Sequence, residues 1–320
     1  MAHDARKPLV LLGILLLVSF LLAPDASPWG SAIHVYIADH LGKDGPLRNV
    51  NEMYGGTAPD VFNYLFDQKA WMDFLYAETH HDFMKVWRAA HLPLGKAAAF
   101  GFLSHNDVWG ADSTAHHQCT RCGFPDGYVI VKAEIMATSI PLSGLGIVIS
   151  DPEFAYGVAR ELYHNIVESA LDLLISHKDP TIGKKLTTAA LLRSPEVPSL
   201  LVEAYARGFS DKFGLRLSDA VKVILDAEMN FRKTMILYGQ VLTQDSATAT
   251  QLVAEQLAAQ AVSFLGSFGI TLPIPPEQVP GLIVWLLGEA TEICQADYFD
   301  EIQGTIQAVR IALRANGIWY

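Results

Sequence analysis

Apolar residues recur along most of this chain at the spacing of one face of an α-helix. SAIHVYIADHLG (31–42) has this pattern and ends on glycine, a residue type common just past the end of a helix. The longest such segment covers 151–177, where Asp151 can cap the helix and Pro152 can occupy its first turn. Further helices are predicted in PDVFNYLF from Pro59, in AAAFGFLSH (97–105), and around 184–193, 197–208, 216–238, 248–266, 279–290 and 297–315.

No convincing run of alternating polar and apolar residues predicts a strand. VIVKAEIMATSI (129–140) is the one β-like stretch, and it fits a buried helix equally well. LLRSPEVPS (191–199) interrupts the helical pattern, and no histidine follows His177. We therefore expect an all-α protein with a multi-helix, bundle-like metal-binding core at about 27–190 and an additional helical C-terminal region at 195–320.

The N-terminus has the pattern of an export signal. Arg6 and Lys7 precede an apolar run, 8–23, which is shorter than the roughly 20 residues that a membrane-spanning helix needs. A signal peptide at 1–26 is predicted, with cleavage near Ala23 or Ala26, and an uncleaved membrane anchor is the alternative. The mature protein is then exported, either secreted or periplasmic.

The amino-acid composition limits the functional classes to which this chain can belong. Hydrophobic residues make up 51% of the chain, enough for a large core, and the net charge is −11. An acidic chain does not suit binding to nucleic acid through phosphate contacts, although bound metal ions would reverse the local charge of a nuclease site. In an exported chain, Cys119 and Cys122 of CTRC predict a local disulfide, with a metal-ligand pair as the alternative. Cys294 is then a buried free thiol.

Imidazoles and carboxylates, the ligand types that zinc prefers, recur through the first half of the chain in an ordered series. His164 and Glu168 are four residues apart in HNIVE and therefore share one helix face. Asp112 and His116 repeat this spacing in DSTAH, and His105 is expected two turns back on the same stripe. The predicted site comprises Trp29, His34, Asp60, His80, His105, Asp112, His116, His164 and Glu168.

The motifs around these residues resemble those of the zinc-dependent phospholipase C and single-strand nuclease superfamily, an all-helical group with three zinc ions in a cleft. The resemblance covers roughly 29–170. The matching motifs are WGSAIHVYIA (29–38), TAPDV (57–61), THHDF (79–83), GFLSHNDVWGADSTAHH (101–117) and YHNIVE (163–168). The resemblance implies that Trp29 and His34 serve one zinc ion and that Asp60 both binds metal and orients the attacking water.

Three ligand positions remain open, each with a neighbour that also fits the motif: His80 or His81, Asp112 or Asp107, and His116 or His117. The acidic position is ambiguous because Trp109 stands four residues after His105, where the family usually has its bridging aspartate. Asp112 is favoured because it shares a helical stripe with His105. For Trp29, core packing at the start of a helix is the alternative to metal binding.

The resemblance implies a phosphodiesterase of phospholipase C type, which hydrolyses phospholipids with metal-activated water and two or three zinc ions. TAPDV and the acidic charge favour this branch, whereas the Trp-x4-His spacing of 29–34 favours a single-strand nuclease. A helical protein that binds metal without catalysis is a third hypothesis. The apolar, proline-broken segment 262–287 predicts either peripheral contact with a membrane or two buried helices joined by a turn.

Overall fold

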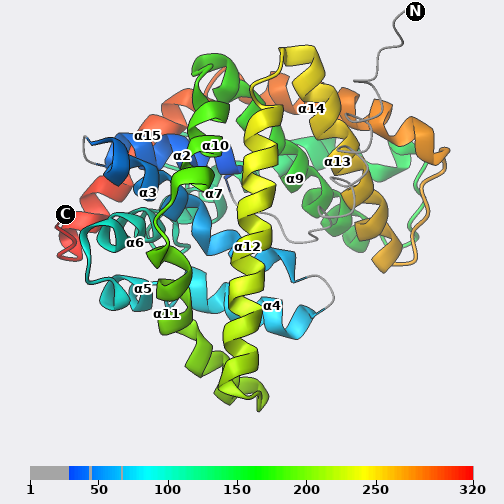
Figure 1. Ribbon diagram of the computed structural model, residues 1–320. Coiled ribbons are helices and arrows are strands. Elements are labelled where there is room, and N and C mark those ends of the chain that lie inside the picture. Colours follow the sequence, from blue (N-terminus) through cyan, green and yellow to red (C-terminus); the bar gives the residue numbers. More distant parts are fainter. Residues whose placement is uncertain (1–28, 43–44, 66–67, 320) are drawn as a thin grey trace, which may run out of the picture.

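The computed structural model describes residues 29–42, 45–65 and 68–319, and every regular element in these ranges is a helix (Figure 1). The all-α prediction is therefore confirmed. The predicted signal peptide at 1–26 lies outside these ranges. Among the helices that are described, none combines the length and the hydropathy of a membrane-spanning segment.

The helices follow one another through short connections. The first part of the chain contains α2 (Ser31–Leu41), α3 (Pro46–Thr57), the 3₁₀ helix η1 (Ala58–Tyr64), α4 (Lys69–His80), α5 (Met84–Ala89), α6 (Pro93–His105), α7 (Ala111–His116) and α8 (Tyr128–Ser139). The second part contains η2 (Leu142–Leu145), α9 (Pro152–Lys178), α10 (Ile182–Leu192), α11 (Glu196–Phe213), α12 (Leu217–Val241), α13 (Ser246–Ser267), η3 (Pro276–Gln278), α14 (Val279–Cys294) and α15 (Tyr298–Ala315).

Helix α2 lies in the interior of the protein. Residues 32–38 of α2 are all buried, and α3, α9, α10 and α15 pack against it. A helix that is apolar on every side is typical of such a covered position. Because α2 carries His34, this candidate ligand lies inside the core and is shielded from solvent.

Helix α9 is the longest helix and begins as predicted. The Asp151 side chain accepts hydrogen bonds from the backbone N–H groups of Glu153 and Phe154, and Pro152 occupies the first turn. Helices α8, α13 and α14 pack along α9. The neighbours of α9 thus include the C-terminal region, which lies beyond the resemblance.

The interruption at 191–199 is a turn fixed by a buried polar network. The Arg193 guanidinium donates two hydrogen bonds to Glu228, of 2.7 and 2.9 Å, and the Tyr54 hydroxyl donates to the same carboxylate at 2.7 Å. The Asn51 side chain accepts from the backbone N–H of Ser194. Because a buried carboxylate is costly unless it is paired, this network connects the turn to α3 and α12. The predicted boundary between 27–190 and 195–320 stays a prediction.

Several local predictions differ from the observed helices. The ambiguous stretch 129–140 is helical, since it forms α8, and η1 is a 3₁₀ helix that follows directly on α3. The stripe expected to carry His105, Asp112 and His116 is wrong, because α6 ends at His105 and a loop separates it from α7. The hydrophobic pattern did not predict α3, α4 and α5 as separate helices.

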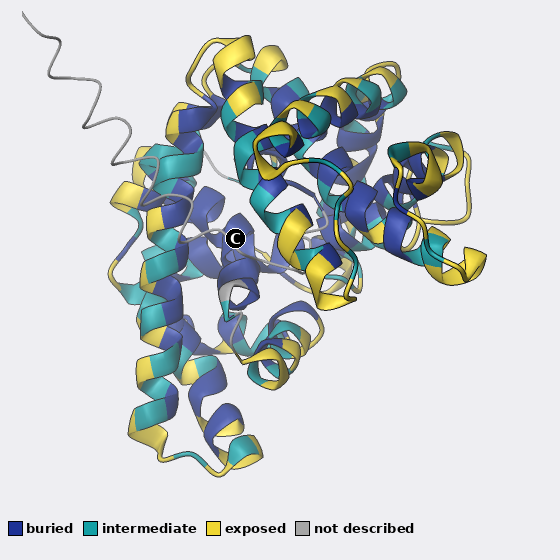
Figure 2. Cartoon of the chain, turned by 90° about the vertical axis from the view of Figure 1, so that its right-hand side faces the viewer, coloured by how far each residue is buried: buried dark blue, intermediate teal, exposed yellow. Residues whose placement is uncertain are grey.

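Burial follows the contacts between helices. Figure 2 shows buried positions on the facing sides of the helices and exposed positions at the outer turns. The segment 262–287 forms the end of α13, a proline-rich connection and the start of α14, and its buried residues are Leu265, Val279, Ile283, Leu286 and Leu287. Val262, Phe268 and Trp285 are the large apolar residues of this segment that stay about half exposed. Membrane contact by this segment stays a prediction.

Candidate metal centre

Three sets of imidazole and carboxylate groups lie close enough together to hold metal ions. Two of these sets, which we call the inner sets, share His105. The third, the outer set, contains a histidine and a glutamate from α9. In each set the candidate ligand atoms lie within 4.8 Å of one another; the sets are His34, His105 and Asp112; Asp60, His80 and His105; and His116, His164 and Glu168. Eight of the nine residues predicted from the sequence therefore come together, from five α-helices and η1.

Asp112 connects the two inner sets. Its Oδ1 lies 3.2 Å from Nε2 of His34, and its Oδ2 lies 2.8 Å from Nε2 of His105 and 3.4 Å from Nε2 of His80. The two oxygens of one carboxylate thus face different imidazoles. This arrangement suits a carboxylate that bridges two metal ions.

The inner histidines are oriented by backbone carbonyl groups. Nδ1 of His105 lies 2.8 Å from the carbonyl oxygen of Gly56, and Nδ1 of His80 lies 3.0 Å from that of Tyr76. A carbonyl oxygen can only accept a hydrogen bond, so each Nδ1 carries a proton and each Nε2 is left as a ligand atom. Metal-binding histidines are commonly held in this way.

Asp60 is placed at the inner sets by η1. Its Oδ1 accepts a hydrogen bond of 3.1 Å from Nδ2 of Asn63 and lies 3.5 Å from Nε2 of His80 and 3.6 Å from Nε2 of His105. Its Oδ2 is buried without a hydrogen-bond partner. The Asn63 contact therefore fixes the carboxylate and leaves one oxygen available.

The outer set lies on α7 and α9. Nε2 of His164 is 2.8 Å from Oε1 of Glu168 and 3.2 Å from Nε2 of His116, so the predicted i, i+4 pair does share a face. Asp107 lies on the far side of the His116 ring, 3.5 Å from Nδ1, and 3.0 Å from Nε2 of His117. Asp107 is thus placed to orient His116.

The open alternatives can now be compared by position. His80 and Asp112 are fully buried within the sets, whereas the neighbour His81 is exposed. The His117 side chain is 59% exposed, against 14% for His116. The geometry favours His80, Asp112 and His116, although their roles as ligands stay predictions.

Unpartnered polar atoms inside the protein provide the test of whether the residues fit metal ions. Buried side-chain atoms with no hydrogen-bond partner among the described residues include Nε2 of His34, Oδ2 of Asp60 and both carboxylate oxygens of Asp112. Buried polar groups are normally satisfied, and each exception calls for an explanation. Cations bound between these atoms would satisfy them, so the donor set fits.

Burial shifts the pKa values of the inner ligands. Burial raises the pKa of Asp112 well above its usual range, and burial lowers the pKa of His34 and of His105. Burial opposes ionisation of Asp60 too, but the neighbouring His105 and His80 hold its pKa well below its usual range. Bound cations would favour the ionised carboxylates and neutral imidazoles that metal binding requires.

The outer set titrates differently. Burial lowers the pKa of His116 to about 4 and raises that of Glu168 to about 7. Burial also opposes the charge on His164, but the carboxylates of Glu168 and Glu161 outweigh it and raise the pKa to about 9. His164 and Glu168 therefore form a buried, proton-holding pair in the absence of metal.

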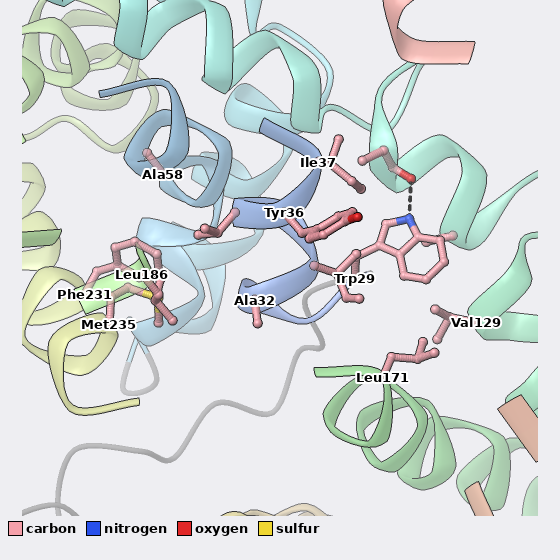
Figure 3. Close-up of a cluster of buried hydrophobic side chains, with 14 of the residues drawn as sticks. Trp29, Ala32, Tyr36, Ile37, Ala58, Val129, Leu171, Leu186, Phe231 and Met235 are labelled. Carbon is pink, nitrogen blue, oxygen red and sulfur yellow. Dashed lines mark hydrogen bonds between the residues drawn. The ribbon is translucent and has the colours of Figure 1, made fainter. Parts of the chain in front are cut away.

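The indole of Trp29 belongs to the core. It is fully buried, stacks on Tyr128 at 5.6 Å between ring centroids, and donates from Nε1 to the carbonyl oxygen of Ala111 at 2.9 Å. Figure 3 shows it between α2 and the side chains of Val129 and Leu171. The side chain of Trp29 thus packs in the core, which was the alternative prediction for this residue. Metal binding at Trp29 stays a prediction.

An unpredicted residue, Asp172, positions the helix that carries His34. Its carboxylate accepts hydrogen bonds from the backbone N–H groups of Ala32 and Ile33, of 3.1 and 3.0 Å, and one of 2.9 Å from the hydroxyl of Tyr238. It therefore caps the N-terminus of α2, which has no capping side chain of its own. A Cβ atom at Gly30 would lie 2.4 Å from this carboxylate.

The loop after α7 is attached to the C-terminal helix. Cys119 and Cys122 form a disulfide, which confirms the prediction of a local bridge. The carboxylate of Glu301 on α15 accepts from the backbone N–H groups of Thr120 and Arg121. Cys294 is a buried free thiol, also as predicted. None of these groups faces the three sets.

Comparison with known proteins finds no matching family model, no matching curated protein and no matching solved structure.

Proposed function

We propose that this chain is an exported zinc-dependent phosphodiesterase of phospholipase C type, which cleaves the glycerol-side phosphate ester bond of phospholipids. The observation that carries the proposal is the convergence of three histidine–carboxylate sets around unpartnered buried ligand atoms. Histidine together with carboxylate suits zinc. The order of these residues along the chain resembles the phospholipase C motifs.

The proposed chemistry assigns separate tasks to the residues. Bound zinc ions would supply water activation and neutralise charge on the phosphodiester. Asp112 would hold the two inner ions at a fixed separation, because its oxygens face His34 on one side and His105 on the other. Asp60, fixed by Asn63, would orient the attacking water with its remaining oxygen.

The inner and outer sets differ in exposure, which indicates where substrate arrives. The inner ligands are at most 2% exposed, whereas the side chains of His116, His164 and Glu168 are 14%, 8% and 7% exposed. A phosphodiester would therefore meet the outer set first. The inner sets would hold ions that are shielded from solvent.

The deciding experiment combines metal analysis with product analysis. Purified protein is loaded with zinc, its metal content is measured by mass spectrometry, and it is incubated with phospholipid vesicles and, separately, with single-stranded DNA or RNA. Two or more zinc ions per chain and release of phosphorylated headgroup are expected. Nucleotides instead of headgroups would favour the nuclease alternative, and fewer than two zinc ions would favour a protein without catalytic function.

A further inference from the structure

A cleft lies beside the outer set, between α9, α12 and α13, which are adjacent in Figure 1. The space in it that the centre of a water-sized molecule can occupy is about 90 Å³, and the cleft opens to solvent. Glu168 lies in its wall, next to Gly30 and Asp172. The same glutamate thus belongs to the candidate metal centre and to the cleft, so a group bound in the cleft would adjoin a phosphate held at the outer set.

The lining of the cleft is polar but carries no cation. Amide side chains come from Asn165, Gln256 and Gln260. Hydroxyl groups come from Ser31, Ser169, Thr234 and Tyr238. Among the described residues that line it, none is a lysine or an arginine. Recognition of a second phosphate or another anion normally uses such cations, so the lining does not suit an additional negative charge.

The lining does not suit a quaternary ammonium group either. Such groups are bound by cages of aromatic rings. Tyr238 is the one aromatic residue in the lining, and its hydroxyl donates to Asp172. Asp172 in turn caps α2 through two backbone N–H groups, so its charge is already engaged. A cationic headgroup would therefore find neither a cage nor a free carboxylate besides the metal-facing Glu168.

The lining instead suits a ligand with neutral hydrogen-bonding groups. Asn165 donates to the carbonyl oxygen of Glu161, which orients its amide. Gln256 is half-buried in the wall and has no hydrogen-bond partner among the described residues. Amides both donate and accept, which matches the hydroxyl groups of a polyol. Apolar side chains of Met235, Val253 and Leu257 complete the wall.

We propose that this cleft binds a neutral polyhydroxyl headgroup, of the glycerol or inositol class, and that Gln256 is a specificity-determining residue. This inference rests on the proposed phosphodiesterase function, because it identifies the cleft with the site of the headgroup, which stays on the phosphate while diacylglycerol leaves. It predicts preference for phospholipids with polyol headgroups over phospholipids with choline headgroups.

The test compares water-soluble, short-chain phosphatidylinositol, phosphatidylglycerol and phosphatidylcholine below their micelle concentrations, with the zinc-loaded full chain. Higher kcat/KM on the two polyol lipids is expected. Gln256→Leu should lower kcat/KM on them by about threefold to tenfold, the worth of one neutral hydrogen bond, and leave phosphatidylcholine unchanged. Gln251→Leu is the matched control, since Gln251 lies on the same helix, is exposed and is absent from the cleft lining.

Equal or faster hydrolysis of phosphatidylcholine overturns the inference while leaving the phosphodiesterase proposal intact. If no phospholipid is hydrolysed, the proposed function fails, and calorimetry with inositol 1-phosphate and phosphocholine still tests the cleft. Tighter binding of inositol 1-phosphate, weakened by Gln256→Leu and not by Gln251→Leu, supports the inference. Equal binding of the two compounds, or tighter binding of phosphocholine, contradicts it.

Discussion

Nε2 of His105 lies 2.8 Å from Oδ2 of Asp112, although the two residues belong to different helices. The loop between them turns sharply because the Asn106 side chain accepts hydrogen bonds from the backbone N–H groups of Val108 and Trp109. Gly110 permits the close approach, since a Cβ there would lie 2.4 Å from the carbonyl oxygen of His105. Loop geometry, and not a continuous helix, therefore brings this pair together.

Asp112→Asn is expected to remove metal from at least one inner set, because the amide keeps only one oxygen ligand and loses the negative charge of the carboxylate. Zinc content measured by mass spectrometry should fall by about one ion per chain or more. Asp126→Asn is the control, since Asp126 is exposed on the following loop. Unchanged zinc content in Asp112→Asn would contradict a bridging role.

Asp60→Asn is expected to abolish turnover while the helical content stays close to that of the wild type. The substitution keeps the side-chain volume but removes the charge that holds metal and orients water. Headgroup release and circular dichroism give the two readouts. Asp73→Asn, at an exposed position on α4, should behave like the wild type. A wild-type rate in Asp60→Asn would show that the site is assigned wrongly.

Glu168→Gln is expected to weaken the outer metal and to lower activity about tenfold or more, the scale seen when metal coordination is perturbed. The inner sets should keep their ions, because Glu168 contacts only His164 of the outer set. Activity and zinc content are measured together. Glu153→Gln, exposed at the start of α9, is the matched control.

Metal affinity of the outer set is expected to rise with pH. The pKa of His164 is about 9 without metal, chiefly because Glu168 and Glu161 overcome the effect of burial, and a protonated imidazole cannot bind a metal ion. Zinc must therefore displace a proton at neutral pH. Affinity should increase by up to about tenfold per pH unit between about pH 7 and 9. Calorimetry in two buffers of different ionisation enthalpy measures the proton release, and its absence would contradict the assignment.

The same protonation has a consequence for the stability of the metal-free protein. Because the folded-state pKa of His164 lies above the unfolded value of about 6.5, its contribution is complete below that pH and is lost as the pH rises toward about 9. Urea unfolding in the presence of a chelator should show this loss. His164→Asn should flatten the dependence over the same range.

Gly30→Ala is expected to destabilise the protein by about 1–3 kcal/mol, because the added methyl group would collide with the Asp172 carboxylate that caps α2. Zinc binding at His34 should weaken as well, since α2 positions that residue. Gly157→Ala is the matched control: a Cβ there meets open space on α9, so stability should stay equal or rise by up to about 1 kcal/mol. Urea unfolding of both variants distinguishes the two effects.

Part of the candidate metal centre could be predicted from local features of the sequence. The spacing of His164 and Glu168 places both on one helix face, and α9 begins at its predicted cap. Motif order placed the remaining candidates in one predicted set, and all of them except Trp29 lie in the three groups of the structure. The helical stripe through His105 and Asp112 was wrong, because periodicity does not show where a short loop interrupts two helices.

Asp107 and Asp172 show what the sequence pattern could not provide. Asp107 was considered only as an alternative ligand, but it lies against His116 and His117. Asp172 had no signal at all, because its partners, the N–H groups of Ala32 and Ile33, are 140 and 139 residues away. The role of Asp172 could be recognised only once the packing of α9 against the start of α2 was known.

The amino-acid sequence by itself determined the helical class, the main helix starts and the residue types of the candidate metal centre, because these depend on periodicity, capping and ligand chemistry within a few residues. Only the tertiary structure decided which atoms face one another, that the Asp112 carboxylate serves two inner sets, and that a neutral polar cleft adjoins the outer one. These features depend on the packing of distant helices and on the geometry of the turns between them, which local pattern does not encode.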